Sequence, residues 1–256
     1  MYALESFPDG RRIRFSANLP LLDRAVEEAV RFVQDHRVTG NLFDVKLLLR
    51  EALLNAVLHG SHSDPKRDVS LEVLADAGQL RLTVTDQGPG FDWRTGLSTL
   101  APPEATTGRG LTIMSLYADD VRFNAVGNQV TLTKAITGLQ CTADADGKNQ
   151  TRRNVMHDIH IENGQTIVCP AGDIVASVAE ELRTRLKEIM REHPGPLVLD
   201  LSHVELIDSV GIGLLIAAHN TLHKRGGQLL LSHVNADLAA LLRTMRLDRH
   251  FSIQPA

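Results

Sequence analysis

The stretch EALLNAVLHG, residues 51–60, carries polar side chains at a spacing that decides how the first half of the chain is interpreted. Glu51, Asn55 and His59 follow one another at intervals of four residues, which stacks side chains on one stripe of an α-helix. The apolar residues around them predict one long helix over 42–60, ended by Gly60. The stripe is therefore either a solvated polar face, with His59 a simple helix-end residue, or a site.

Length and composition limit what such a site can do. The chain has 256 residues, of which 43% are hydrophobic and 23% charged, enough for two modest cores and hence two domains. A net charge of -4 gives no electrostatic reason to expect nucleic acid or an anionic membrane as a partner. Cys141 and Cys169 fit neither a disulfide framework nor a zinc site. With no signal peptide and no apolar run near the roughly 18 residues of a membrane span, we expect a soluble cytoplasmic protein.

A polar stretch in the middle of the chain predicts the domain organisation. Residues 138–154 contain almost nothing to bury and are expected to link a domain over 1–137 to a second over 155–256. Each domain is expected to combine helices and strands, which makes the protein a two-domain α/β chain. In the first domain we expect helices over 19–36, 42–60 and near 110–118, with strands within 69–88 and 120–135. In the second we expect a hairpin over 158–172, helices over 175–193, 210–226 and 236–245, and strands over 196–202 and 228–233.

Two further motifs of the first domain are candidates for ligand binding. In TVTDQGPGF (83–91) a strand ends at Asp86, whose carboxylate can accept a hydrogen bond from an adenine amine, and Gly88 and Gly90 leave room for the ring. In ATTGRGLTIM (105–114) a Gly-Arg-Gly turn precedes a helix, whose first backbone amides favour phosphate oxygens. Each motif alone is equally compatible with an ordinary turn. Together with a carboxylate and an amide on a helix, suited to a general base and a Mg²⁺ ligand, they favour a nucleotide site.

These three motifs, in this order, resemble the ATP-binding domain shared by gyrase, histidine kinases and MutL-type repair proteins, most closely its branch of anti-sigma factor serine kinases. The resemblance covers roughly residues 10–136 and implies an α/β sandwich that binds ATP and Mg²⁺ beneath a flexible lid over 91–107. It assigns Glu51 as the general base and Asn55 as the Mg²⁺ ligand. It assigns the remaining matched positions to the nucleotide: Asp86 to adenine, and Gly88, Gly90, Thr107, Gly108, Arg109 and Gly110 to the nucleotide loops. Some of these kinases carry an arginine just before the first glycine of the last motif, where Thr106 and Thr107 stand here.

A different motif marks the second domain. In VLDLSHVELIDSVGIGLLIAAH (198–219) Asp208 and Ser209 stand directly before a helix. Ser209 fits a helix N-cap, and a hydroxyl there is also where a phosphate is well tolerated by the helix dipole. Residues 155–256 resemble a STAS domain, the fold of anti-sigma factor antagonists, in which the serine of this motif is phosphorylated by a partner kinase. The resemblance makes Ser209 the expected phosphoacceptor.

The two resemblances together imply a partner-switching regulator: an ATP- and Mg²⁺-dependent serine kinase joined to an antagonist-type substrate. Its expected partners are a STAS antagonist or its own STAS domain, a sigma factor or another signalling protein, and a second copy in a homodimer. Transfer within one chain and between two chains both stay open. The competing hypothesis is a nucleotide-gated binding scaffold without catalytic turnover.

Overall fold

The structure is a computed structural model of the whole chain. It describes residues 1–36, 41–76, 78–98, 102, 105–136, 158–162, 164–193 and 195–256. These residues form two compact units, and each is described by itself: the front unit takes the described residues of 1–100 and 109–146, and the rear unit those of 101–108 and 147–256. The predicted linker over 138–154 lies outside the described residues, so the predicted domain limits 1–137 and 155–256 stay predictions.

The front unit is built on a six-stranded antiparallel sheet in the order β1-β2-β3-β4-β6-β5. Along its strands apolar residues alternate with polar ones, so that one face is buried and the other meets solvent. On the polar face Arg12 of β2 donates to Glu72 of β3 at 3.1 Å. The strands are β1 Tyr2–Phe7, β2 Gly10–Ser16, β3 Asp68–Asp76, β4 Gln79–Thr85, β5 Asp120–Phe123 and β6 Gln129–Ala135.

The sequence analysis places helices over 19–36 and 42–60 first in this domain and no strand before them; this order is wrong, because a β1–β2 hairpin precedes the helices. Only Ile13 and Phe15 of β2 are buried large apolar side chains, whereas Arg12 and Arg14 between them are exposed. This short alternation is a half-buried strand pattern, but two apolar positions are too few to stand out in a charged segment. Pairing with the long strand β3 stabilises β2 as a strand, which the local sequence alone does not indicate.

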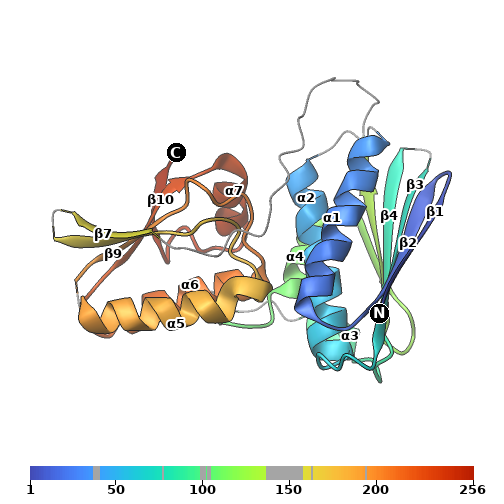
Figure 1. The fold of residues 1–256 in the computed structure, drawn as a ribbon, viewed down its shortest axis with the longest axis horizontal. Helices are drawn as coiled ribbons and strands as arrows, with labels where there is room; N and C mark the ends of the chain where they lie inside the picture. Colours follow the sequence, from blue (N-terminus) through green and yellow to red (C-terminus); the bar gives the residue numbers. More distant parts are fainter. Residues whose placement is uncertain are drawn as a thin grey trace. The chain divides into compact units, whose positions relative to one another are not determined.

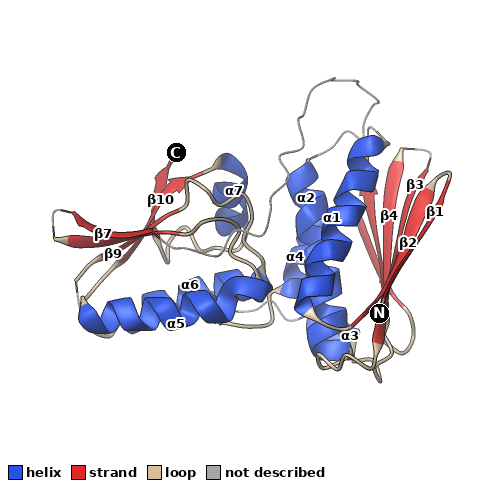
Figure 2. Cartoon of the chain, in the orientation of Figure 1, coloured by secondary structure: helices blue, strands red, loops and turns tan. Residues whose placement is uncertain are grey.

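Helices cover the buried face of the front sheet (Figures 1 and 2). Asn18 caps the first of them through its side chain, which accepts from the N–H of Leu21 at 3.0 Å. Close packing of α1 and α4 on α2 buries most residues of α2, among them the charged Arg50 and Glu51. The helices are α1 Leu19–Asp35, α2 Leu42–Leu54, η1 Asn55–Gly60, α3 Trp93–Ser98 and α4 Gly110–Tyr117.

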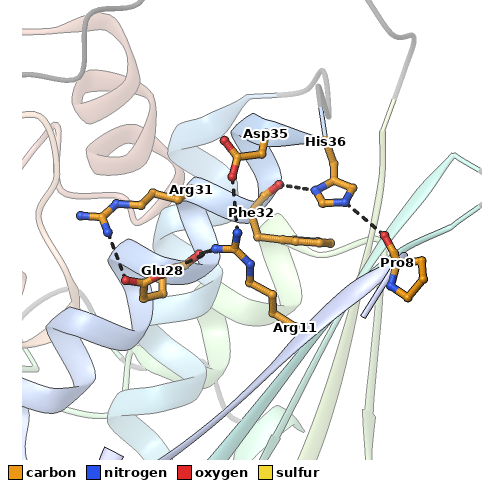
Figure 3. A network of polar contacts seen from close by, with 7 residues as sticks. All are labelled: Pro8, Arg11, Glu28, Arg31, Phe32, Asp35 and His36. Atoms are coloured by element: carbon orange, nitrogen blue, oxygen red, sulfur yellow. Dashed lines mark hydrogen bonds and ion pairs between the residues drawn. The ribbon is translucent and has the colours of Figure 1, made fainter. Parts of the chain in front are cut away.

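Polar contacts attach the β1–β2 hairpin to α1 (Figure 3). Arg11 of β2 donates to the carbonyl oxygen of Glu28 at 3.1 Å and lies over the ring of Phe32. One ring nitrogen of His36, at the end of α1, lies 2.9 Å from the carbonyl oxygen of Phe32. The other ring nitrogen lies 3.3 Å from the carbonyl oxygen of Pro8, in the hairpin turn. The hairpin is therefore held to the helix as well as to the sheet.

The helix predicted over 42–60 changes form at Asn55. From there to Gly60 the chain winds as the π-helical turn η1, in which the N–H of Ser61 donates to the carbonyl oxygen of Ala56 at 2.8 Å. Hydrogen bonds five residues apart widen the turn, so the four-residue stripe ends at Asn55. His59 is exposed, as a simple helix-end residue would be.

The rear unit is built on a five-stranded sheet in the order β11-β10-β9-β8-β7. Its strands pair in parallel, except for the β7–β8 hairpin. The predicted helices and strands of this half are present, with an additional final strand, β11, that the sequence analysis does not predict. The elements are β7 Asp158–Glu162, β8 Gln165–Cys169, α5 Ala176–Glu192, β9 Leu197–Asp200, α6 Ser209–His223, β10 Leu229–Val234, α7 Ala236–Thr244 and β11 Ser252–Pro255.

Helices α5 and α6 pack side by side in the rear unit (Figure 1). Each buries a row of aliphatic side chains, Leu182 and Leu186 from α5 and Leu215 and Leu222 from α6 among them. Among the residues that the structure describes, no helix combines the length and the apolar character needed to cross a bilayer.

Candidate functional site

The Glu51–Asn55 pair lies against the start of α4. A Cβ atom added to Gly110, the first residue of α4, would lie 2.9 Å from Oε2 of Glu51 and 3.3 Å from Oδ1 of Asn55. The backbone of Gly110 therefore contacts both side chains directly. Glu51 is fully buried and Asn55 is half-buried. The structure thus brings Gly110 next to Glu51 and Asn55, more than 50 residues earlier in the chain, and the sequence predicts all three in one site.

A second group forms around Asp86, at the end of β4. Its Oδ1 accepts a hydrogen bond from the N–H of Gly88 at 2.7 Å, so the carboxylate is held within its own turn. A Cβ at Gly60 would collide with the Asp86 carboxyl group, and a Cβ at Gly88 would collide with the carbonyl oxygen of Gly60. Gly60 belongs to this group although the sequence analysis gives it only the role of ending a helix.

Burial changes the acidity of this carboxyl group. The pKa of Asp86 is raised above its ordinary value mainly because the group is partly removed from water. The hydrogen bond from Gly88 and the positive charge of Arg67 act in the opposite direction and lower the pKa. Arg67 also donates to the carbonyl oxygen of Gly60 at 3.2 Å. Asp86 is therefore a partly buried carboxyl group that is held by one backbone N–H. Such a group is suited to forming a hydrogen bond with a polar edge of a ligand.

The turn η1 connects the two groups. Asn55 at its first position contacts Gly110, and Gly60 at its last position contacts Asp86. π-Helical turns occur mostly as single turns within α-helices and frequently at functional sites. The predicted metal ligand and the predicted adenine acceptor therefore lie at the two ends of one six-residue element.

The remaining residues predicted to bind the nucleotide differ in their surroundings. Gly90 packs its backbone against Val126. Thr107 and Gly108 are exposed, whereas Arg109 is only 1% exposed. The short helix α3 occupies part of the predicted lid over 91–107, and residues 99–101, 103 and 104 of that lid lie outside the described residues.

Helix α4 begins without a side-chain cap: Arg109 at its N-cap position makes no side-chain capping hydrogen bond. Backbone amides at an uncapped helix start attract phosphate oxygens, and the helix dipole favours the negative charge. Glu51 and Asn55 lie beside that start through their contact with Gly110. The predicted base, the predicted Mg²⁺ ligand and a helix start without a side-chain cap are thus adjacent.

In the rear unit the cap of α6 is Asp208, and the expectation that Ser209 is the N-cap is wrong. Oδ1 of Asp208 accepts from the N–H of Gly211 at 2.9 Å, in the geometry of a helix cap. Its Oδ2 accepts from the N–H of Ala176, the first residue of α5, at 2.8 Å. One fully buried carboxylate thus caps two helices, and Ser209 occupies the first helical position, half-buried.

The loop before Asp208 is tied to the chain leading into α5. Oδ1 of Asp173 accepts from the N–H groups of Glu205 and Leu206, both at 2.9 Å. Ile174 and Ile207 form a parallel bridge directly behind the two-helix cap. The segment carrying Ser209 therefore has a fixed path on both sides of the serine.

Comparison with known proteins matches a domain to each half of the chain. Residues 15–134 match the histidine kinase-like ATPase domain, and residues 157–256 match the STAS domain. The anti-sigma F factor of Anoxybacillus flavithermus is 31% identical over 102 residues, which cover 38% of this chain and 70% of that protein. The chain belongs to the anti-sigma F factor family of histidine kinase-like ATPases. Its rear half is a STAS domain joined to that family's fold.

Other members of the family and one solved STAS-type structure extend the comparison. The anti-sigma F factor of Geobacillus stearothermophilus is 37% identical over 87 residues, or 32% of this chain. The chain spans 60% of the length of that protein. The crystal structure of an anti-sigma factor antagonist from Mycobacterium paratuberculosis is 25% identical, with a TM-score of 0.36, and covers 40% of this chain and 86% of its own. The assignment to the family does not depend on that structure.

Two structural features of the candidate sites are not predicted by the sequence analysis. The π-helical form of η1 has no simple residue signature, because its sequence is also a good α-helix. The double cap at Asp208 carries a local signal, since aspartate is among the preferred N-cap residues. Its second partner at Ala176 lies 32 residues away and follows only from the fold.

Proposed function

We propose that the chain is a partner-switching regulator in which an ATP- and Mg²⁺-dependent serine kinase domain acts on a STAS domain. Ser209 is the proposed phosphoacceptor, in the same chain or in a second copy, and a separate STAS antagonist is an alternative substrate. The proposed downstream partner is a sigma factor or another signalling protein. The family assignment and the STAS match support this combination.

The observation that carries the proposal is that two groups of polar side chains, each able to bind a ligand, lie at the two ends of η1. Asn55 and Glu51 lie against Gly110 at one end, and Asp86 lies against Gly60 at the other. A glycine at each contact lets the two segments approach closely, because a Cβ atom there would press on the opposing side chain. These polar groups fit a nucleotide: at one end a carboxylate can accept a hydrogen bond from an amine, and at the other end lie groups suited to phosphate and metal.

Each residue has a proposed role in the reaction. Asp86 accepts a hydrogen bond from the adenine amine, and the amide oxygen of Asn55 is a ligand of the hard type that Mg²⁺ prefers. The bound Mg²⁺ supplies neutralisation of phosphate charge. Glu51 takes the proton from the attacking serine hydroxyl, as a positioned general base does. The uncapped start of α4 orients the phosphates through its backbone amides.

The position of Ser209 explains how its phosphorylation would act. Because Asp208 caps the helix, the hydroxyl of Ser209 is not the group that holds the end of α6. A phosphate at the first helical position is favoured by the helix dipole and adds nearly two negative charges to the surface there. Phosphorylation is therefore expected to leave the fold intact and to weaken a docking surface by charge repulsion and desolvation.

The test is transfer of labelled phosphate from ATP in the presence of Mg²⁺ to the full chain. We expect label on Ser209, lost in Ser209→Ala and in Glu51→Gln, and retained in Ser202→Ala, which removes an exposed serine of the same unit. Label on a separate STAS protein but not on Ser209 would locate the substrate elsewhere. Absence of label on both proteins would refute the kinase activity and leave the nucleotide-gated binding scaffold as the remaining hypothesis.

One observation favours the scaffold without turnover as a second candidate. Arg109 is buried, and no arginine precedes Gly108, where Thr106 and Thr107 stand. A cation that stabilises a transferring phosphoryl group has to reach it. In this alternative ATP binding alone changes the surface that holds the partner.

The proposal also includes a cytoplasmic location and a homodimer. It includes neither nucleic acid nor a membrane as a partner. Sedimentation with and without nucleotide tests the dimer. A monomer at all concentrations that still transfers phosphate would remove the homodimer and keep the kinase.

A further inference from the structure

A turn outside the predicted motifs is joined to the Asp86 loop by hydrogen bonds. Residues 124–128, with the sequence NAVGN, connect β5 to β6. The N–H of Asp86 donates to the carbonyl oxygen of Asn128 at 3.0 Å. The side-chain amide of Asn128 in turn lies 3.4 Å from the carbonyl oxygens of Asp86 and Gly88, to which it donates. The main chain on both sides of the Asp86 carboxylate is therefore held by one residue of this turn.

The same two segments also interlock through their backbones. A Cβ at Gly90 would collide with the carbonyl oxygen of Val126, and a Cβ at Gly127 would collide with that of Phe91. Both glycines have positive φ angles, 80° and 86°, which a residue with a side chain rarely adopts. Because each segment presses a glycine against the other, neither can shift without moving its neighbour.

Asn124 fixes the turn from within. Its Oδ1 accepts from the N–H groups of Gly127 at 2.7 Å and of Asn128 at 3.2 Å. These two donors require an oxygen, so its Nδ2 faces the other way and donates to Oδ1 of Asn128 at 2.8 Å. That bond occupies the oxygen of the Asn128 side chain and turns its amide group towards Asp86 and Gly88. Asn124 thus determines which end of Asn128 meets the Asp86 loop.

Asn124 also contacts the first turn of α3. The indole Nε1 of Trp93 donates to the carbonyl oxygen of Asn124 at 3.1 Å, and the indole stacks on Phe123, the residue before it. Phe91, at the end of the Asp86 loop, packs edge-on against the same Phe123 ring. One asparagine is therefore bonded to the turn that holds Asp86 and to the helix that opens the predicted lid.

We propose that Asn124 is a positioning residue for base selection: through Asn128 it holds the Asp86 carboxylate where it distinguishes an amino from an oxo group on a purine. This inference rests on the proposed nucleotide site. Sites built to hydrogen-bond a ligand group reject an analogue that lacks it, provided that their polar groups are held in place. A base with a 6-oxo group offers Asp86 no amine donor, so the ratio of affinities for adenine and hypoxanthine nucleotides measures the position of the carboxylate.

The experiment measures the affinities of the full chain for ATP and inosine triphosphate, with Mg²⁺, by calorimetry. We compare wild type with Asn124→Ala, which removes all three side-chain bonds, and with Asn124→Asp, which keeps the two acceptor bonds and loses the donor to Asn128. Val126→Ala is the matched control, since it changes an exposed side chain of the same turn and keeps the carbonyl that meets Gly90.

We expect wild type and Val126→Ala to prefer ATP, and both Asn124 variants to lose at least ~10-fold of that preference through weaker ATP binding, which corresponds to about 1.4 kcal/mol. The emission of Trp93, the single tryptophan, reports whether each variant is folded. A variant that keeps the wild-type ratio, or loses affinity for both nucleotides equally, would overturn the positioning role. Absence of binding to either nucleotide by wild type would refute the nucleotide site itself, and the inference with it.

Discussion

Removal of the Asp208 carboxylate is the sharpest test of how the rear unit is held together. Asp208→Ala deletes the acceptors of two backbone N–H groups, those of Gly211 in α6 and Ala176 in α5. The hydrogen bond from Gly211 is buried and that from Ala176 is half-buried, and both are accepted by a carboxylate. With ~1.5 kcal/mol for each lost hydrogen bond to a charged group, the expected loss of unfolding free energy is about 3 kcal/mol.

The aromatic residues of the chain make this loss separable from the front unit. Trp93 and both tyrosines, Tyr2 and Tyr117, belong to the front unit. Urea unfolding followed by Trp93 emission therefore reports the front unit alone, whereas far-ultraviolet circular dichroism reports both. For a urea m-value of about 2 kcal/mol/M, the rear transition of Asp208→Ala is expected ~1.5 M lower, with the Trp93 transition unchanged.

Two further variants check the reasoning behind that number. Asp208→Asn keeps an acceptor for one helix and points an amide N–H at the other, so it is expected to lose a smaller but clear part of the stability. Glu181→Ala, an exposed carboxylate on α5, is expected to stay within about 0.5 kcal/mol of wild type. A rear transition of Asp208→Ala that coincides with wild type, or a Trp93 transition that falls with it, would refute the double cap.

Three predictions concern the nucleotide site. Glu51→Gln is expected to lower phosphate transfer by ~10² or more with unchanged ATP affinity, as removal of a general base does, and full activity would contradict that role. The pKa of Asp86 is raised by burial, so its contribution to stability is present at low pH and lost as the pH rises through that pKa. Asp86→Asn is therefore expected to raise the urea midpoint at pH 7 and to weaken ATP binding. The gain in midpoint is expected to shrink below about pH 4, and an equal gain at both pH values would argue against the raised pKa. Gly110→Ala places a Cβ 2.9 Å from Oε2 of Glu51 and is expected to weaken ATP binding ~10-fold or more, or about 1.4 kcal/mol, with an unchanged circular dichroism spectrum; unchanged affinity would show that the ligand does not enter there.

Much of the fold follows from periodicity in the sequence. The long helices and the alternating strands β3 and β4 have enough apolar positions to be recognised, and the Asn163-Gly164 pair predicts the β7–β8 hairpin. The β1–β2 hairpin is missed because its strands gain their stability from β3 rather than from their own residues. β11 is missed for the same reason, since it joins the sheet by pairing in parallel with β10.

The site is predictable where chemistry and spacing coincide. The pairing of Glu51 with Asn55 follows from helical spacing, and their contact with Gly110 follows from the resemblance of the motifs to one family. The parts that escape prediction are backbone contacts between distant segments, such as those of Gly60 with Asp86. The residue type alone does not predict such a contact, because glycine is equally common in ordinary turns.

The widened turn η1 makes the distance between the two halves of the site depend on a count of residues. An α-helix turns by ~100° per residue, whereas a π-helical turn fits one more residue into each turn. Deletion of one residue between Asn55 and Gly60 is therefore expected to restore an α-helical turn with little change in the direction that Gly60 faces. Insertion of one residue would instead rotate Gly60 by about 100° away from Asp86. A chain lengthened by one residue here is thus expected to keep Glu51 and Asn55 beside Gly110 and to lose the contact of Gly60 with Asp86.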